Sequence, residues 1–296
     1  MAAGRAPLTS LAGRTALLTG ATGALGCAIA GAYGRAGARL LLSARDESRL
    51  QALARTLSTQ YRCDVSTLPC DLSQPAHVRR LAEDACQRFG GLDILVNAAA
   101  VIGPIGPVWE TDWTEWTRTL EINLYAAAHL CQLCIPHMPL GSGRGKIVNL
   151  SGGGATSPRP QFSAYAAAKT ALVRFSETLA EELADRAIDV NCVAPGILKS
   201  ALTQAAYDAG PDRVGRREYE AAATVMSGQA DGREHAADLC AFLASDASDG
   251  ITGKLISAQW DPWPSLAEHR ADLAGTDLYT LRRIVPRDRG LTWDTT

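Results

Sequence analysis

Short apolar runs alternate with longer segments of helical periodicity along almost the whole chain, and this alternation constrains the fold more than any other feature. The apolar runs are continuous, which is typical of parallel strands buried on both faces of a sheet. We predict strands at Thr15–Thr19, Arg39–Ser43, Ser66–Cys70, Asp93–Asn97, Lys146–Ser151, Asp189–Ala194 and Lys254–Ala258. We predict helices at Leu25–Arg35, Glu47–Gln60, Pro75–Phe89, Asp112–His137, Ser163–Asp185 and Arg233–Ala244. The pattern favours an α/β fold in which helices flank both faces of a mainly parallel, seven-stranded sheet.

We predict a single doubly wound, Rossmann-type domain, because no compositional linker or repeat interrupts the alternation. Residues 1–258 are assigned to this dinucleotide-binding and catalytic domain. Within it, residues 199–232 are polar and only weakly helical at Arg216–Ala223, which indicates a mobile flap over a substrate site. Residues 259–296 follow the last strand with tryptophans and mixed charges, and we expect a lid or a subunit contact there.

The composition is ordinary for a compact protein, with 47% hydrophobic and 20% charged residues. A formal net charge of −2 provides no broad basic surface, so we expect neither nucleic acid nor a membrane as a partner. The sequence has no apolar run of signal-peptide or membrane-helix length. Its eight cysteines are scattered through apolar segments, and its histidines lack metal-ligand spacing. We therefore expect a cytoplasmic protein with buried thiols and no metal site.

A glycine-rich turn, TGATGALG, follows the first predicted strand and opens the first helix. Backbone N–H groups at such a helix N-terminus can hold a pyrophosphate. Gly20 and Gly26 are the positions where we expect the missing Cβ to matter, one for the turn and one for close approach to a cofactor.

Tyr165 and Lys169 lie four residues apart near the start of a long predicted helix. This spacing puts the phenol and the ammonium on one helical face, with Cβ atoms about 5–6 Å apart. A neighbouring cation stabilises phenolate, so Lys169 would lower the pKa of the phenol toward neutrality. An isolated motif of this kind is more often a tyrosine packed on the sheet beside a solvated lysine. Here, further polar residues follow the same strand ends.

In combination, these motifs resemble the short-chain dehydrogenase/reductase family over roughly residues 12–257. The resemblance rests on motifs in the family's order, namely Thr19-Gly20 with Ala24 and Gly26, Asp71-Leu72, Asn97-Ala-Ala-Ala100, Asn123, Ser151, Tyr165-xxx-Lys169 and Pro195-Gly196. It implies an NAD(P)-dependent oxidoreductase that moves a hydride to or from a carbonyl carbon.

The resemblance also implies residue roles. Tyr165 would be the general acid in carbonyl reduction, and Lys169 would lower its pKa and hold the nicotinamide ribose. Asn123 would support a proton-relay water through the helix backbone. Asp71 would contact the adenine of the cofactor, and Asn97 would lie along the cofactor. Pro195 and Ile197 would frame the nicotinamide ring, and Ser200 would offer a hydroxyl to its carboxamide. The other cofactor positions are Thr19, Gly20, Thr22, Gly23, Leu25, Gly26, Leu72 and Gly196.

The sequence departs from the family pattern in four places. Ala24 replaces a common glycine, NAAA replaces NNAG, and Gln259–Trp263 replaces an acidic-glycine ending. The family's carbonyl-polarising serine lies thirteen residues before the tyrosine, and Gly152 occupies that position here. We assign the role to Ser151, because the glycines that follow could let its hydroxyl turn into the site. Three other hydroxyl residues remain as alternatives, namely Thr156, Ser157 and Ser163.

The end of the second predicted strand favours NADP(H) over NAD(H). In dinucleotide folds an acidic residue there binds the ribose 2′-hydroxyl and repels a 2′-phosphate. Ala44 holds this position, and Arg45 follows with a guanidinium suited to a phosphate. Ser43 could add a hydroxyl contact. Asp46 could instead pair with Arg45 or supply an NAD-type carboxylate, but it lies beyond the position from which an acidic residue contacts the ribose.

We therefore expect an NADP(H)-dependent enzyme that interconverts a ketone and a secondary alcohol on a small metabolite. An epimerase or dehydratase that retains its nicotinamide is an alternative, and so is a catalytically idle cofactor-binding regulator. The resemblance further implies a homodimer or homotetramer that pairs the helices predicted at Asp112–His137 and Ser163–Asp185.

Overall fold

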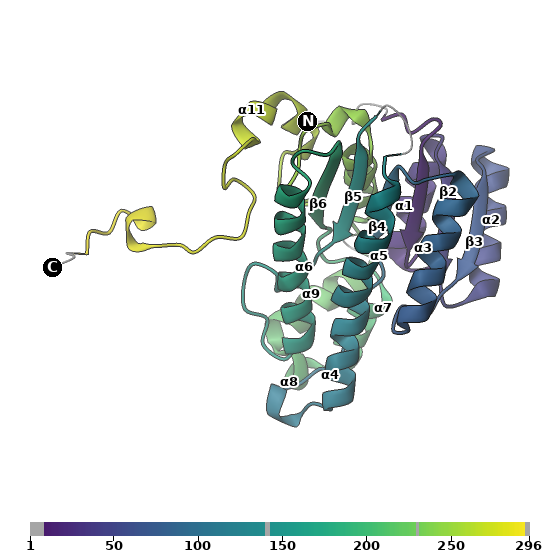
Figure 1. The fold of residues 1–296 in the computed structure, drawn as a ribbon. Helices are drawn as coiled ribbons and strands as arrows, with labels where there is room; N and C mark the ends of the chain where they lie inside the picture. Colours follow the sequence, from purple (N-terminus) through teal and green to yellow (C-terminus); the bar gives the residue numbers. More distant parts are fainter. Residues whose placement is uncertain (1–8, 140–142, 229–230, 294–296) are drawn as a thin grey trace.

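A computed structural model, which describes residues 9–139, 143–228 and 231–293, contains one seven-stranded sheet (Figure 1). Neighbouring strands are parallel, in the order β3-β2-β1-β4-β5-β6-β7. The strands are β1 (Thr15–Thr19), β2 (Arg39–Ala44), β3 (Val65–Pro69), β4 (Ile94–Asn97), β5 (Gly145–Leu150), β6 (Ile188–Ala194) and β7 (Lys254–Ser257). The predicted fold class is confirmed, and each predicted strand end falls within one residue of its observed position.

Helices cover both faces of the sheet. They are α1 (Ala24–Arg35), α2 (Glu47–Tyr61), α3 (Pro75–Phe89), α4 (Trp113–Leu120), α5 (Ala126–Cys134), α6 (Ser163–Glu182), α7 (Ala201–Asp208), α8 (Pro211–Val214), α9 (Arg216–Met226), α10 (Arg233–Ala244) and α11 (Arg270–Leu273). One core cluster joins the sheet to α1, α2 and α10, and another joins it to α3, α5 and α6. Within β1, Leu18 belongs to the first cluster and Leu17 to the second, which explains the continuous apolar runs.

The strand order reverses at β1, which lies between β2 and β4. The connections that leave the carboxyl ends of β1 and β4 therefore diverge to opposite sides of the sheet. In doubly wound sheets this divergence opens a crevice for a ligand. The fold thus places the loops after β1, β2, β4, β5 and β6 around one edge of the sheet.

The single helix predicted at Asp112–His137 is wrong in one respect, because the segment is not continuous α-helix. It consists of α4, a π-helical turn at Glu121–Tyr125, α5 and a 3-10 turn at Ile135–His137. A π turn adds a residue to one helical turn without ending the apolar face, so the sequence pattern conceals it. Asn123 lies within this turn.

The segment 199–232 contains more helix than the weak pattern at Arg216–Ala223 predicts. It forms α7, α8 and α9, separated by Gly210 and Gly215, which both adopt positive φ angles. These helices lie beyond the carboxyl ends of the strands (Figure 1). Their apolar residues pack against Phe162 and Tyr165, so the helices depend on tertiary contacts that local sequence does not reveal.

The tail after β7 begins packed on the domain. Trp263 is buried against α10, and its indole N–H donates to Nε2 of His235 at 3.1 Å. Further on, the carbonyl of Tyr279 accepts a hydrogen bond from Leu255 N at 2.8 Å, along the outer edge of β7. Residues 282–293 then lead away from the sheet (Figure 1). Across the described ranges we find no helix with the length and apolarity needed to span a bilayer.

The two glycines singled out in the turn after β1 have distinct structural reasons. Gly20 has a φ of +67°, and a Cβ there would lie 2.6 Å from Cα of Ala99 in the loop after β4. A Cβ on Gly26 would lie 2.2 Å from the carbonyl oxygen of Gly20. The close approach at Gly26 is therefore made by the chain's own turn, and this corrects the expectation that a cofactor alone requires it.

We expect Gly26→Ala to destabilise the protein by about 1–3 kcal/mol, because the new methyl group meets backbone that cannot move freely. Gly31→Ala is the matched control in α1, since its nearest neighbour would be the Tyr61 hydroxyl at 4.0 Å. That substitution should stabilise the helix by about 0.5–1 kcal/mol. Urea unfolding of both variants checks the pair, and equal stability changes would contradict this account of the turn.

Candidate active site

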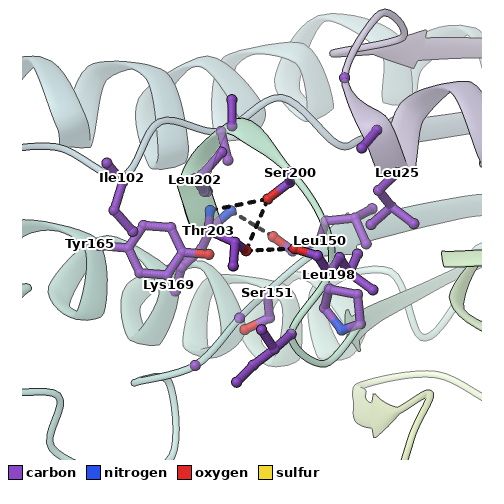
Figure 2. Close-up of a pocket in the computed structure, with 18 of the residues that line it drawn as sticks. Leu25, Ile102, Leu150, Ser151, Tyr165, Lys169, Leu198, Ser200, Leu202 and Thr203 are labelled. Carbon is purple, nitrogen blue, oxygen red and sulfur yellow. Dashed lines mark hydrogen bonds between the residues drawn. The ribbon is translucent and has the colours of Figure 1, made fainter. Parts of the chain in front are cut away.

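A cleft of about 1680 Å³ lies at the carboxyl edge of the sheet, with α7 and α9 forming part of its wall (Figure 2). This exceeds the roughly 300–1,000 Å³ of most small-ligand pockets, so the cleft has room for a dinucleotide and a second molecule. Most sequence-predicted site residues line it, namely Gly20, Thr22, Gly23, Leu25, Gly26, Arg45, Asp71, Leu72, Ser151, Tyr165, Lys169, Pro195, Gly196, Ile197 and Ser200. Thr19, Asn97 and Asn123 do not line it.

Tyr165 and Lys169 are both buried in the first turns of α6, and Nζ of Lys169 lies 5.8 Å from the centroid of the phenol ring. Lys169 donates to the carbonyl of Leu150 at 2.7 Å (Figure 2). Burial lowers the pKa of Lys169 to about 8. Burial also raises the pKa of the Tyr165 phenol, and the charge of Arg159 opposes that rise. The expected lowering of the Tyr165 pKa by Lys169 is therefore not found, because burial raises this pKa and the charge that opposes the rise is that of Arg159.

Ser151 is placed where the resemblance requires a hydroxyl. It directly follows β5, is 3% exposed and lines the cleft near Lys169 and Tyr165 (Figure 2). Its Oγ has no hydrogen-bond partner among the described residues. A buried hydroxyl without a partner is costly, which favours a ligand that completes its bonding. Of the alternatives, Thr156 and Ser157 are exposed at the cleft, whereas Ser163 accepts from Trp116 and lies outside it.

Gly152 leaves the space that the Tyr165 hydroxyl occupies. A Cβ at residue 152 would lie 2.4 Å from Oη of Tyr165. The glycine that replaces the family's usual serine is therefore coupled to the position of the phenol. At Gly153 the nearest atom to an added Cβ would be Cζ of Arg159 at 4.0 Å, so the next residue lacks this constraint.

The three predicted residues outside the cleft make structural hydrogen bonds. Asn123 binds both backbone groups of Val101, at 2.9 and 2.8 Å, and so joins the π turn to the loop after β4. Asn97 donates to Asn149 at 2.9 Å. Thr19 donates to the carbonyl of Val96 and accepts from Ala98 N.

A cavity of about 10 Å³ lies between these residues and Lys169. Thr19, Asn97, Asn123 and Lys169 all line it, and Oδ1 of Asn97 has no hydrogen-bond partner among the described residues. The volume and the polar lining suit about one water molecule. Asn97, which the sequence placed along the cofactor, thus faces this inner cavity instead.

At the β6 end of the cleft, Ser200 has a structural role beside the predicted one. Its Oγ caps α7 by accepting from Thr203 N at 3.3 Å, and it lies 3.2 Å from the Thr203 hydroxyl (Figure 2). The hydroxyl lines the cleft as well. Pro195 and Ile197 lie on the same wall.

The β2 end of the cleft is basic. Arg45 is exposed at the cleft, while Asp46 caps α2 by accepting from Arg49 N at 3.0 Å. Two arginines that sequence reasoning missed also line this part: Arg49, which donates to the carbonyl of Thr22 at 2.8 Å, and Arg233 of α10. The signal for Arg49 was its place one helical turn after Arg45. No local signal marks Arg233.

Sequence reasoning also missed an ion pair at the opposite end of the cleft. Nε and Nη2 of Arg159 donate to the two carboxylate oxygens of Glu218 at 3.0 and 2.9 Å. Both residues line the cleft, and 59 sequence positions separate them.

Comparisons with known proteins agree with the fold. A family model described as enoyl-(acyl carrier protein) reductase matches residues 20–259. Human dehydrogenase/reductase SDR family member 4 is 33% identical over 246 residues, covering 83% of this chain and 86% of that protein. D-threitol dehydrogenase of Mycolicibacterium smegmatis is 34% identical over 243 residues, covering 82% and 90%.

Solved structures show the same similarity. A Beutenbergia cavernae protein assigned as an NAD(P)-dependent gluconate 5-dehydrogenase, with NADP bound at low occupancy, has a TM-score of 0.73 and 31% identity, covering 84% of this chain and 96% of that one. A dehydrogenase/reductase from Sinorhizobium meliloti has a TM-score of 0.72 and 27% identity, covering 84% and 94%.

We expect Gly152→Ser to displace the Tyr165 hydroxyl and to reduce turnover about 100-fold, even though serine is the residue that the resemblance places there. The reason is the 2.4 Å approach of a Cβ to Oη of Tyr165. Gly153→Ser should leave the phenol in place. Crystal structures and kcat values of the two variants check this, and full activity of Gly152→Ser would refute the steric coupling.

Proposed function

Because the chain belongs to the short-chain dehydrogenase/reductase family, whose members are NAD(P)-dependent oxidoreductases of small molecules, we propose that it interconverts a ketone and a secondary alcohol with NADP(H). The observation that supports this best is the burial of Tyr165 and Lys169 side by side in the cleft, beside the unpartnered hydroxyl of Ser151. A proton donor, a cation and a free hydroxyl donor at one point suit the reduction of a carbonyl.

Each residue has a definite task in this proposal. Ser151 Oγ donates a hydrogen bond to the substrate carbonyl oxygen and polarises it. When bound, the reduced nicotinamide supplies the hydride to the carbonyl carbon. Tyr165 Oη gives its proton to the oxygen, and the alcohol leaves. Lys169 holds a positive charge near the phenolate that remains.

The phenol must then regain a proton. Lys169 reaches both the cleft and the inner cavity that Asn123 lines. A water in that cavity would connect Lys169 with the π turn around Asn123 and supply the proton from that side. In alcohol oxidation the same steps run backwards, and Tyr165 acts as the base.

The cleft fits an NADP-type cofactor. Gly20 and Gly26 let the turn after β1 close tightly against backbone, and no side chain caps the start of α1, so backbone N–H groups there can bind a pyrophosphate. Near the end of β2, Arg45 can bind a 2′-phosphate and stack on adenine. Arg49 and Arg233 add positive charge to the same part of the cleft.

Asp46 accepts hydrogen bonds from Arg49 N and from Ser48, and these bonds hold the pKa of its carboxyl below the usual value. Its carboxylate is thus engaged as a helix cap, which favours NADP(H) over NAD(H). No other acidic residue occupies the end of β2.

We also propose a homodimer or homotetramer. Trp109, Trp113 and Tyr125 are 81%, 67% and 56% exposed on α4 and the segments beside it. Such a concentration of exposed aromatic surface is typical of a protein interface. A cytoplasmic location suits the eight unpaired cysteine thiols, which persist in a reducing compartment.

We expect Tyr165→Phe to fold and to bind NADPH while losing at least about 1,000-fold in kcat, because the change deletes the transferable proton and little volume. The test is a panel of ketones, sugars and alcohols, scored by NADPH oxidation or NADP reduction in the wild type and the variant. The absence of any nicotinamide turnover by the wild type over such a panel would count against the proposed reaction.

Ser151→Ala and Ser163→Ala serve as a matched pair in the same assay. The first should lower kcat by about 10²–10³, because it removes the polarising donor. The second should change kcat little, since Ser163 bonds to Trp116 outside the cleft. An unaffected Ser151→Ala enzyme would move the role to Thr156 or Ser157.

The choice of cofactor gives a separate prediction. Wild type should have a higher kcat/KM for NADPH than for NADH, and Arg45→Ala should reduce that ratio by about tenfold, since it removes one charge-assisted contact to the 2′-phosphate. Arg62→Ala is a suitable control, because Arg62 lies at the far end of α2. A preference for NADH in the wild type, or an unchanged ratio in Arg45→Ala, would show that Arg45 does not select the cofactor.

A further inference from the structure

The ion pair between Arg159 and Glu218 joins two parts of the site that are far apart in the sequence. Arg159 belongs to the loop between β5 and α6, whereas Glu218 is in the first turn of α9. The guanidinium donates two parallel hydrogen bonds to the carboxylate. The side chains are 17% and 32% exposed, so solvent screens this pair only partly.

The chain presents Arg159 rigidly. It lies between Pro158 and Pro160, whose rings fix their φ angles and stiffen the loop. Its guanidinium lies 4.2 Å from the centroid of the Phe162 ring and 5.4 Å from that of Tyr165. A cation at these distances over an aromatic face is attracted to it. Arg159 is thus held by its partner Glu218 on one side and by two rings on the other.

This placement bears on the charge environment of Tyr165. The ionisable groups that face the phenol from the elements packed against it are Lys169 of α6, Arg159 of the preceding loop, and Glu218 and Tyr219 of α9. Glu218 is neutralised by Arg159, and Tyr219 stacks on Tyr207. The charge of Arg159 is therefore what counters the burial of the phenol, and the position of Arg159 depends on the flap.

We propose that the Arg159–Glu218 pair is a latch that closes α9 over the cleft, and that Arg159 is a positioning residue whose charge over the Tyr165 ring is present only while the latch holds. The inference rests on the proposed role of Tyr165 as the proton donor and adds a coupling between the flap and that role. Opening of α9 takes Glu218 away, frees Arg159 to turn toward water, and leaves the buried phenol harder to ionise.

The flap is also attached through its apolar residues, which pack against Phe162 and Tyr165. α9 begins at Gly215, which has a φ of +84° and provides no side-chain cap. A second tether comes from α8, where Arg213 donates to the carbonyl of Ile105 at 2.8 Å. Arg213 resembles Arg159 in fixing the flap to the body, but among the described contacts only Arg159 lies over the Tyr165 ring, so Arg213 provides a matched control.

The first experiment measures the ionised fraction of Tyr165. For NMR, the protein is prepared with tyrosine isotope-labelled at Cζ, and the Tyr165 resonance is identified by its loss in Tyr165→Phe. All variants are compared at the highest pH at which circular dichroism shows each to be folded. Arg159→Gln should raise the Tyr165 pKa by about one unit relative to wild type. Arg159→Lys should restore part of the difference, and Arg213→Gln should match wild type.

Glu218→Gln distinguishes a latch from simple charge neutralisation. If Glu218 holds Arg159 in place, its loss should raise the Tyr165 pKa, because the guanidinium leaves the ring. If Glu218 only neutralises Arg159, its loss should lower the pKa. Glu220→Gln, an exposed carboxylate on the same helix, should have no effect. Two results would overturn the proposal. One is a lower Tyr165 pKa in Glu218→Gln than in wild type. The other is an equal ionised fraction of Tyr165 in wild type and Arg159→Gln, including the case in which neither ionises.

The second experiment measures amide hydrogen exchange of α9. Arg159→Gln and Glu218→Gln should increase exchange over Arg216–Met226 by about tenfold relative to Glu220→Gln, because the latch no longer holds the helix closed. Unchanged protection of α9 contradicts the latch. Neither experiment measures turnover. Results that contradict the latch therefore leave the proposed reaction unaffected. If the nicotinamide assays instead show no turnover, the proposed reaction is wrong, but the Tyr165 pKa values and the exchange rates of α9 are unchanged.

Discussion

A parallel sheet can satisfy its backbone hydrogen bonds only between neighbouring strands, and both of its faces must be covered by apolar side chains. In this protein the requirement fixes almost everything else. Leu17 and Leu18 point into separate cores, helices must return over each face, and every strand ends at the same edge. Because β1 lies between β2 and β4, the chain leaves that edge in two directions and opens the cleft there. The candidate catalytic and cofactor-binding groups therefore come from separate loops that follow the strands of one sheet.

The strands were predictable because double-sided burial leaves a continuous apolar signal. The π turn at Glu121–Tyr125 was not, since one extra residue in a turn barely disturbs the apolar face. The helix α7 was not predicted, and α9 was predicted only as a weak helix at Arg216–Ala223, because the stability of both comes from packing on Phe162 and Tyr165. Motif spacing placed Tyr165, Lys169 and Ser151 at the cleft, yet it did not show which way side chains face. Asn97 and Thr19 belong to cofactor motifs but bond within the sheet. Arg159 and Glu218 meet across 59 positions, a distance at which sequence patterns carry no information.

The environments of Tyr165 and Lys169 both disfavour the charged form of the side chain. Burial disfavours both the phenolate of Tyr165 and the ammonium of Lys169, so neither charge is well stabilised by its surroundings alone. Among the described residues, the unpartnered buried polar atoms include Ser151 Oγ and Gln161 Oε1 at the cleft and Asn97 Oδ1 at the inner cavity, and Lys169 lines both spaces. Such arrangements cost stability and are retained where a ligand or a water completes them. In the proposed reaction, the polar groups thus extend from the cleft, through Lys169, to the inner cavity beside the π turn.

The contact between Leu255 N and the Tyr279 carbonyl, made where the tail passes β7, has a consequence for solubility and assembly. An uncovered edge strand is a template onto which a foreign strand can add, and long apolar edges promote aggregation. Here Lys254 also donates to the carbonyls of Thr276 and Leu278, so the tail fastens itself along the edge and shields it. The tail thus prevents a strand of another protein from adding to the sheet at β7. In the proposed oligomer, copies of the chain would then meet through helix surfaces, whose side chains can discriminate between partners, and not through the backbone of β7.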